Sequence, residues 1–485
     1  SPPPPPPPPP PFDSWDEAFS AATPCIAPTR LSAADDNVPA FERWRSVDHL
    51  ATHMPTVRVH ESPSQIVQMS SMVQPFGKLE ELSWRRPWIE KNISARALFE
   101  SSSSRNRASW PYFFSGVDHL PAQLRSDLGA LLPKLSTPFL PAIETNLWAG
   151  VPNVSSPLHY DAAHNVYCQM VGRRRWQLVP PEESFSLYPY PRLHPSTRQS
   201  RINLRDYPPA DDGRSGRFNR LFGRSPLRIL EGVLAPGDRL YVPPYWWHSV
   251  AVEDGYGSAL AVAVYSQSTP MRAYGILKEH PLPDQLRGCK ARCDGDPNGA
   301  CCLPSLRAYV LALAALHPPD GGASHIDDDH HSFACAIPRR CVCFADADAY
   351  ERRYGVLATE MMASTAIDDP GVAIVRELLE TRYRHLDDPE IVEGMPQMLR
   401  AARERMRARV GALQEELTPA DAASLRAHAR RLRERVIAMP SKGDGVVTRA
   451  MWRMEMHSLV EDVASAAVGA REVEAVMAWI AGEAV

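Results

Sequence analysis

Residues 156–171 read SPLHYDAAHNVYCQMV, and this stretch indicates the fold more clearly than any other part of the chain. Its second half, Asn165–Val171, is mainly apolar and aromatic, which is typical of a strand buried in a sheet. Gly172 follows directly and favours a turn. The stretch therefore predicts a strand and a turn, preceded closely by two polar side chains, His159 and Asp161.

The same texture extends over residues 141–268, where runs rich in Val, Tyr, Trp and Leu are broken by Pro, Gly and Asp. Many short strands joined by tight turns are typical of an antiparallel sandwich or barrel. A further turn is expected at the Pro-Gly-Asp of residues 236–238. The strands that we predict are Glu144–Gly150, Asn165–Val171, Arg175–Val179, Arg239–Val242 and Ser258–Tyr265.

A chain of 485 residues is too long for one compact domain. Apolar residues recur at helical spacing after residue 345, as in Ile374, Val375, Leu378 and Leu379, and predict an α-helical C-terminal region. We expect a proline-rich disordered tail over residues 1–34, a mainly β domain with flanking helices over 35–270, a Cys-, Asp- and His-rich insertion or linker over 271–344, and a helical domain over 345–485.

The composition is that of an ordinary soluble protein, with 44% hydrophobic and 23% charged residues. The formal net charge of −4 gives no whole-chain reason to expect a nucleic-acid partner. No apolar run approaches the ~20 residues that cross a bilayer, so no membrane partner is expected. The opening run Pro2–Pro11 is unlike a signal or transit peptide, and we expect a cytoplasmic and/or nuclear location.

The nine cysteines do not have the pattern of a disulfide framework, and we expect their thiols to be reduced. Cys25 and Cys168 stand alone in the sequence. The other cysteines include no Cys-x-x-Cys pair with a partner at zinc-site spacing, so a structural zinc is not expected. These crowded cysteines are Cys289, Cys293, Cys301, Cys302, Cys335, Cys341 and Cys343.

The Arg-rich residues 400–435 suggest two alternatives, an RNA-binding face or a charged helix surface. Acidic residues are interspersed among the arginines, which favours a helix surface with local ion pairs. These acidic residues are Glu404, Glu415, Glu416, Asp421 and Glu434.

Three residues have the types that bind a catalytic metal. His159 and Asp161 lie two apart, and residues two apart on a strand point to the same face of the sheet. Far downstream, the strand-like run that begins at Tyr241 ends in a second imidazole, His248. Two His and one carboxylate are the donor set of non-haem iron(II) oxygenases. We therefore predict that His159, Asp161 and His248 are catalytic and bind iron(II).

The stretch from Asn146 to Tyr265 also resembles a known family, the JmjC/cupin-like oxygenases, and within it the asparaginyl hydroxylase factor inhibiting HIF. The resemblance implies a double-stranded β-helix, or cupin jelly roll. It further implies hydroxylation of an Asn, Asp or His side chain of a protein, with iron(II) as the cofactor and with 2-oxoglutarate and O2 consumed to give succinate and CO2. The matching motifs are His159-Tyr160-Asp161-Ala162-Ala163-His164-Asn165, Tyr188-Pro189-Tyr190-Pro191, His194-Pro195, Arg198-Gln199-Ser200 and Pro244-Tyr245-Trp246-Trp247-His248.

Residue roles follow from the same resemblance. It assigns the binding of 2-oxoglutarate to Tyr112, Ser156, Asn165 and Arg174, and contact with the substrate to Arg198 and Gln199. The sequence departs from the family in two places. Arg174 stands where a Lys is usual, which keeps the charge needed for a carboxylate. Ala263 stands where the family has an Asn, and we expect weaker binding of 2-oxoglutarate as a result.

Two alternatives remain open at this point. One is a tRNA-base hydroxylase of the wybutosine type, which shares the His-x-Asp core. The other is a cupin-like binding protein without turnover, for which Ala263 is the best support. A protein or peptide is the preferred partner, and the C-terminal helices are a candidate for forming a homodimer, as they do in the similar hydroxylase.

Overall fold

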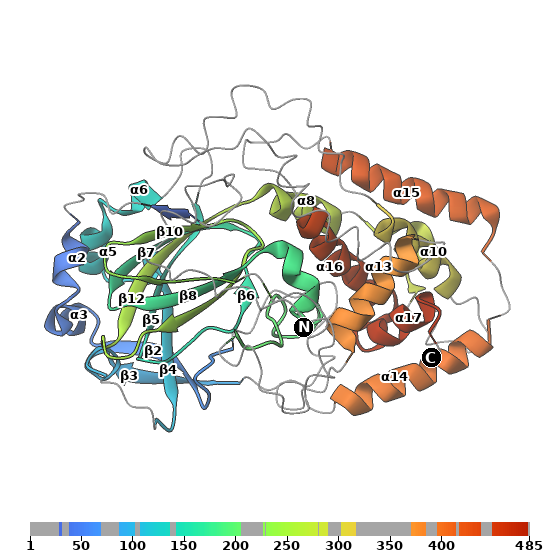
Figure 1. Cartoon of the computed structure of the whole chain (residues 1–485). Helices are drawn as coiled ribbons and strands as arrows, with labels where there is room; N and C mark the ends of the chain where they lie inside the picture. The colour runs from blue at the N-terminus through green and yellow to red at the C-terminus, as the bar shows by residue number, and fades with distance from the viewer. Residues whose placement is uncertain are drawn as a thin grey trace, which may run out of the picture.

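The computed structural model of the chain has a β-rich part and a helical part that lie side by side (Figure 1). The structure describes residues 29–31, 38–68, 87–101, 107–135, 142–204, 227, 229–279, 281–289, 302–316, 370–384, 395–413, 417–437 and 449–483. The proline run lies outside the described residues. So do five of the crowded cysteines, namely Cys293, Cys301, Cys335, Cys341 and Cys343, and the expectations for all of these residues stay untested.

The β-rich part contains two antiparallel sheets. The larger sheet has eight strands in the order β1-β10-β7-β12-β5-β4-β2-β3. Its strands are β1 (Thr29–Leu31), β2 (Thr56–Ser62), β3 (Ile89–Ser94), β4 (Trp110–Gly116), β5 (Ala142–Gly150), β7 (His164–Val171), β10 (Arg239–Val242) and β12 (Ala259–Ser266). The smaller sheet has the order β6-β11-β8-β9, with β6 (His159–Tyr160), β8 (Arg174–Val179), β9 (Leu230–Leu234) and β11 (Trp247–Val252).

The two sheets enclose an aromatic core, as expected for a jelly roll. Inward residues alternate with outward ones along each strand, so that Trp176 and Leu178 of β8 meet Tyr167, Leu240 and Ala263 of the larger sheet. Gly172 and Gly237 have φ values of 67° and 94° at the predicted turns. All five predicted strands are present, displaced by at most two residues at either end, and the mainly β fold class is confirmed.

Short helices cover the outer face of the larger sheet. They are α2 (Pro39–Arg43), α3 (Val47–His53), α4 (Ala95–Phe99), η3 (Val117–His119), α5 (Ala122–Leu128) and α6 (Leu132–Leu135). Their apolar side chains, such as Leu50, Leu98 and Leu124, pack with Leu147 and Val262 of the sheet in one buried cluster. This layer covers the outer face of the larger sheet. The opposite face of that sheet packs against the smaller sheet and forms the interior of the barrel.

The helical part has its own apolar core and includes a segment from the predicted insertion. Residues 303–314 form α10 (Leu303–Ala314), so the helical region starts earlier in the chain than residue 345. The core also joins α8 (Thr269–Glu279), η7 (Asp284–Leu286), α13 (Pro370–Leu378), the π-helical turn η9 (Leu379–Tyr383), α14 (Met395–Gly411), α15 (Pro419–Ile437), α16 (Arg449–Val468), η10 (Ala470–Glu472) and α17 (Val473–Ile480). Among the described helices, none is at once long enough and apolar enough to cross a bilayer.

Two details of the helical part differ from expectation. Cys289 and Cys302 form a disulfide, with Cα atoms 5.7 Å apart, whereas reduced thiols were expected. Both cysteines are buried in the helical core, which brings them together although the sequence spacing gives no such signal. Cys168 is buried and free, as predicted. The Arg-rich helix α14 does form ion pairs, but Arg403 and Arg405 pair with Glu474 and Glu472 from α17 and η10 rather than with acids nearby in sequence.

A buried carboxylate ties three of the covering helices together. Asp127 on α5 is fully buried and accepts hydrogen bonds from four side chains. Arg43 Nη1 donates to Oδ1 at 2.7 Å, and Gln123 Nε2 donates to the same oxygen at 3.1 Å. The other oxygen, Oδ2, accepts from Trp44 Nε1 at 3.1 Å and lies 2.7 Å from His49 Nε2. The carboxylate therefore joins α5 to α2 and α3.

Replacing this carboxylate is expected to destabilise the β-rich part. Asp127→Ala leaves buried donors without their acceptor, and we expect the free energy of unfolding to fall by about 3 kcal/mol. Urea denaturation measures this change. Asp118→Ala, at an exposed position close by, is the matched control. Equal stability of the two variants would contradict the role given to Asp127.

Candidate metal centre and co-substrate site

The structure brings the three predicted metal ligands together at one end of the barrel. His159 on β6 pairs directly with His248 on β11, and their ring centroids are 4.2 Å apart. Asp161 Oδ2 lies 3.6 Å from His248 Nε2. One potential ligand atom from each of the three residues lies within 4.8 Å of the others. Among the residues that the structure describes, this is the group of His, Cys, Asp and Glu with metal-site geometry.

Backbone carbonyls orient both imidazoles. His159 Nδ1 lies 2.9 Å from the carbonyl oxygen of Pro157, and His248 Nδ1 lies 3.0 Å from that of Trp246. A carbonyl only accepts, so each Nδ1 carries the proton and each Nε2 keeps its lone pair. Such partners on the far nitrogen are typical of metal-binding histidines. The local chain therefore presets the tautomer that a cation needs.

The electrostatics of the group also fit a divalent cation. His248 is 2% exposed, and burial, together with the neighbouring His159, lowers its pKa to about 4. The imidazole is thus neutral at pH 7 and able to bind a metal. Asp161 Oδ2 is buried without a hydrogen-bond donor among its neighbours, which is costly for a carboxylate unless a cation faces it. Two imidazoles and one carboxylate suit iron(II).

The backbone that carries these ligands differs from the sequence prediction. Asp161 lies just beyond the end of the two-residue strand β6, so the two-residue alternation of a strand is not what places it. His248 does not end the strand that starts before it. The chain turns at Pro244 and Tyr245, where Tyr245 has a φ of 65°, and His248 is the second residue of a new strand in the other sheet.

A buried guanidinium lies in the same barrel. Arg174 on β8 is 2% exposed, and its Nη2 donates to the carbonyl oxygens of Trp148 at 3.0 Å and Ala259 at 3.4 Å. Its Nε has no partner, and no carboxylate of the described residues lies within ion-pair distance of it. Arg174 also interacts with the phenol of Tyr112, where burial raises the pKa and the guanidinium opposes the rise. An unpaired buried cation of this kind favours an anionic ligand.

Asn165 and two aromatic residues occupy the interior between the metal ligands and Arg174. Asn165 Oδ1 is buried without a hydrogen-bond partner. Trp176 stacks on His248 with ring centroids 5.6 Å apart, and it meets Tyr167 edge to face at 4.7 Å. Sequence reasoning missed Trp176 and Tyr167. Their signal was the alternation along β7 and β8, which places each of them two residues from a predicted co-substrate residue.

Two other positions complete the interior. Ser156 Oγ accepts the backbone N–H of Val250 at 2.9 Å, which holds this segment against β11 and leaves the O–H free to donate elsewhere. Ala263 is fully buried opposite Asn146 and Tyr167, and its methyl group packs in the aromatic core. The position therefore offers no hydrogen bond beside Asn165.

The predicted substrate residues lie directly against β6. Arg198 has a φ of 66° and accepts the backbone N–H of Tyr160 at 3.1 Å through its carbonyl oxygen. Gln199 is buried and forms a β-bridge with His159. Burial lowers the pKa of Arg198, but Tyr160 and the carboxylate of Glu455 outweigh burial, and the net shift is upward. The guanidinium is therefore charged and partly shielded by an acid from a distant helix.

A polar cavity of about 500 Å³ lies on the outward face of the smaller sheet. Arg175, Gln177, Glu231 and Ser249 line it, and these side chains point away from the barrel interior. It is therefore separate from the metal ligands.

A family model described as the cupin-like domain matches residues 13–269. JmjC domain-containing protein D of Dictyostelium discoideum is 33% identical over 108 residues, which are 22% of this chain and 22% of that protein. A tRNA wybutosine-synthesizing protein 4 of Neurospora crassa is 31% identical over 176 residues, 33% of this chain and 13% of that protein. The chain thus spans less than a quarter of the length of these two relatives. The solved Escherichia coli ribosomal oxygenase YcfD is 15% identical, with a TM-score of 0.27, over 76% of this chain and 72% of that one.

The buried His194, close in sequence to Arg198 and Gln199, makes the stability of the protein depend on pH. Burial, with the charge of Arg201, lowers the pKa of His194 to about 3, whereas an unfolded His titrates near ~6.5. Between these values the unfolded chain binds the additional proton, so stability falls as the pH is lowered from about 6.5 towards 3. Each such group contributes about 1.4 kcal/mol per pH unit within this window.

Between pH 6 and pH 4, the wild type is therefore expected to lose about 1.4 kcal/mol of stability per pH unit through His194, and His194→Gln is expected to remove this loss. Urea denaturation of the metal-free protein at several pH values measures it. The exposed His119→Gln serves as control. A wild-type slope in the His194 variant would show that this imidazole does not take up the proton on unfolding.

Proposed function

Because this chain belongs to the cupin-like domain family, we propose that it is an iron(II)- and 2-oxoglutarate-dependent oxygenase that hydroxylates a protein side chain. The observation that carries the proposal is the combination of two features within one barrel. His159, Asp161 and His248 form a preset metal group, and the buried Arg174 has no acidic partner within the described part of the chain. A metal-chelating dicarboxylate satisfies both features at once.

Each residue then has a definite task. Bound iron(II), with 2-oxoglutarate and O2, supplies the oxidation in which 2-oxoglutarate becomes succinate and CO2 while one oxygen atom enters the substrate. Arg174 pairs with the distal carboxylate, and Tyr112 and the free O–H of Ser156 add hydrogen bonds to it. Asn165 orients the end of the co-substrate near the metal. Trp176 and Tyr167 exclude water from the space between.

A protein side chain is the preferred substrate because of the loop that carries Arg198 and Gln199. An amide such as that of Gln199 pairs with a substrate Asn amide in both directions, donor to acceptor and acceptor to donor. The β-bridge of Gln199 with His159 keeps this loop beside the metal ligands. The likeness to factor inhibiting HIF in the same motifs supports an Asn, Asp or His target.

A tRNA base is the second candidate substrate. It is supported by the alignment with a relative whose name is tRNA wybutosine-synthesizing protein 4. A cupin-like binding protein without turnover is the third candidate, and Ala263 supports it because the position gives no hydrogen bond beside Asn165. One assay separates the three.

The proposed oxygenase is expected to form succinate from 2-oxoglutarate with iron(II) and ascorbate, and to do so faster with ankyrin-repeat peptides that contain Asn, Asp and His. His159→Ala is expected to reduce turnover by about 100-fold or more, because a metal ligand is lost. Succinate is measured directly, and hydroxylation of the peptide by mass spectrometry. Stimulation by tRNA alone would support the second candidate. Iron binding without succinate from any substrate would support the third.

Arg174 allows a test that separates binding from folding. Arg174→Met is expected to weaken the binding of 2-oxoglutarate by roughly 10- to 100-fold, which corresponds to the loss of a charge-assisted hydrogen bond of about 1.5–3 kcal/mol. Without ligand, the same variant is expected to be as stable as the wild type or more stable, because it removes an unpaired buried charge. Thermal melting with and without 2-oxoglutarate and zinc measures both effects.

Arg174→Lys keeps the charge and is expected to retain part of the binding. Arg175→Met, exposed on the other face of the same strand, is the matched control for the change of residue type. A loss of stability in ligand-free Arg174→Met would instead make Arg174 a structural residue.

A further inference from the structure

Helix α16 runs through the middle of the helical part and reaches the metal end of the barrel (Figure 1). It contacts α8, α10, α13 and α17. It also contacts the 3₁₀ helix η4 (Pro181–Ser186), and we call the segment from the end of η4 to Gln199 the substrate loop. From Ala450 to Ser465 every residue of α16 is buried. Met451 and Met454 pack in the same cluster as Tyr160, Tyr245 and Trp247 from the metal end. The helix therefore packs against both the helical part and the barrel.

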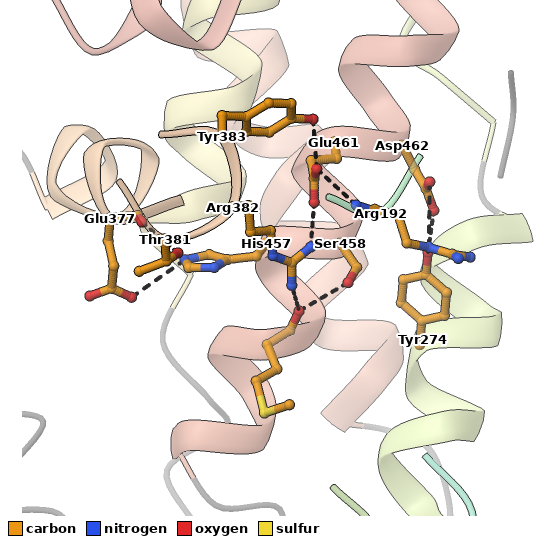
Figure 2. A network of polar contacts seen from close by, with 11 residues as sticks. Arg192, Tyr274, Glu377, Thr381, Arg382, Tyr383, His457, Ser458, Glu461 and Asp462 are labelled. Carbon is orange, nitrogen blue, oxygen red and sulfur yellow. Dashed lines mark hydrogen bonds and ion pairs between the residues drawn. The ribbon is translucent and has the colours of Figure 1, made fainter. Parts of the chain in front are cut away.

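Acidic side chains of α16 hold the substrate loop, as Figure 2 shows. Glu461 Oε1 accepts the backbone N–H of Arg192 at 3.0 Å and the hydroxyl of Tyr383 at 2.7 Å. The other oxygen of Glu461 pairs with Arg382. Asp462 accepts from Tyr274 and faces Arg192. The loop that contains Arg198 is thus fixed to this helix by buried, charge-assisted contacts.

One acid of the same helix reaches the metal ligands through a single residue. Glu455 is 6% exposed, and its Oε1 accepts the hydroxyl of Tyr245 at 2.6 Å. The backbone N–H of Tyr245 donates to the carbonyl oxygen of Asp161 at 2.7 Å. The ring of Tyr245 also stacks on Tyr160, with centroids 5.6 Å apart. A movement of Tyr245 would therefore be transmitted to Asp161.

Tyr245 needs such support because of its backbone. A φ of 65° is unfavourable for a residue with a Cβ and is kept only where the surroundings hold it. A hydrogen bond from a buried phenol to a carboxylate is charge-assisted and strong enough to offset such strain. An apolar residue in place of Glu455 would pack at least as well in a helix interior, so packing alone does not account for a buried acid here.

We propose that Glu455 is a positioning residue of the metal centre, which holds Tyr245 in its strained turn and thereby fixes the segment that carries Asp161. The inference rests on the proposed function, since it assigns to α16 a part in the same site. It makes the C-terminal helical part a component of the metal centre and not a separate module. The part of Glu455 that positions Tyr245 is its acceptor oxygen, because the hydroxyl of Tyr245 donates to it.

Cobalt(II) titration of the metal-free full chain tests this, followed by the visible absorption of the bound ion. Tyr245→Phe removes only the donating hydroxyl, and Glu455→Ala removes the accepting carboxylate together with the rest of the side chain. Both are expected to raise the dissociation constant for cobalt(II) by about tenfold and to alter the visible spectrum in the same way, as changes outside the ligand set do. The double variant is expected to be no worse than Glu455→Ala alone, because the contact that Tyr245→Phe removes is already broken.

Two further variants separate positioning from folding. Glu455→Gln keeps an acceptor oxygen for Tyr245 and is expected to bind cobalt(II) within about twofold of the wild type. Glu377→Gln changes another buried acid of the α16 interface, which pairs with Arg453 and lies 3.5 Å from His457. It is expected to lower stability without changing the cobalt(II) spectrum.

The inference is overturned if Tyr245→Phe binds cobalt(II) with wild-type affinity and spectrum, or if Glu377→Gln changes both to the same extent as Tyr245→Phe. Failure of the proposed function has a different signature. The wild-type chain would then form no succinate from 2-oxoglutarate, whether or not it binds cobalt(II) through His159.

Discussion

The candidate site depends on the antiparallel pairing of β6 with β11, which places His159 directly opposite His248. Side chains of opposed residues share one face of a sheet, so the pairing alone brings the two imidazoles together. With only two residues, β6 is too short to persist without support. The bridge from His159 to Gln199 supplies some of that support. Strand pairing, substrate loop and metal group therefore form one unit.

Buried polar atoms without partners lie in the barrel beside this unit, and they favour a bound ligand there. Protein interiors rarely leave such atoms unsatisfied, because a buried polar group without a partner costs about 1–3 kcal/mol. Here Asp161 Oδ2, Asn165 Oδ1 and Arg174 Nε are all buried without partners in the same barrel. An apolar core of this size would be more stable without them. A chelating dicarboxylate would accept from Arg174 Nε, and a divalent cation would face Asp161 Oδ2.

The helical part contributes to this arrangement through charge. Its central helix has buried acids that meet Arg192 of the substrate loop, Tyr245 of the turn before β11, and Arg382 of η9. Removing one partner of such a pair is costly, since the other is left charged in a low-dielectric interior. The barrel and the helices are therefore coupled, and the loop between them is held from both sides.

The sequence by itself determined the strands of the barrel and the three ligand types, because alternation, turn residues and a His-x-Asp motif are local signals. The family resemblance predicted roles for Arg174 and Asn165, and the structure buries both of them in the barrel. The tertiary structure decided the rest. Asp161 is placed by a turn beyond β6, Trp176 packs on His248 across the sheet, and Cys289 meets Cys302 in a buried core. Glu455 reaches Tyr245 from a helix far along the chain. Contacts between segments so distant depend on how elements pack, and no local pattern encodes them.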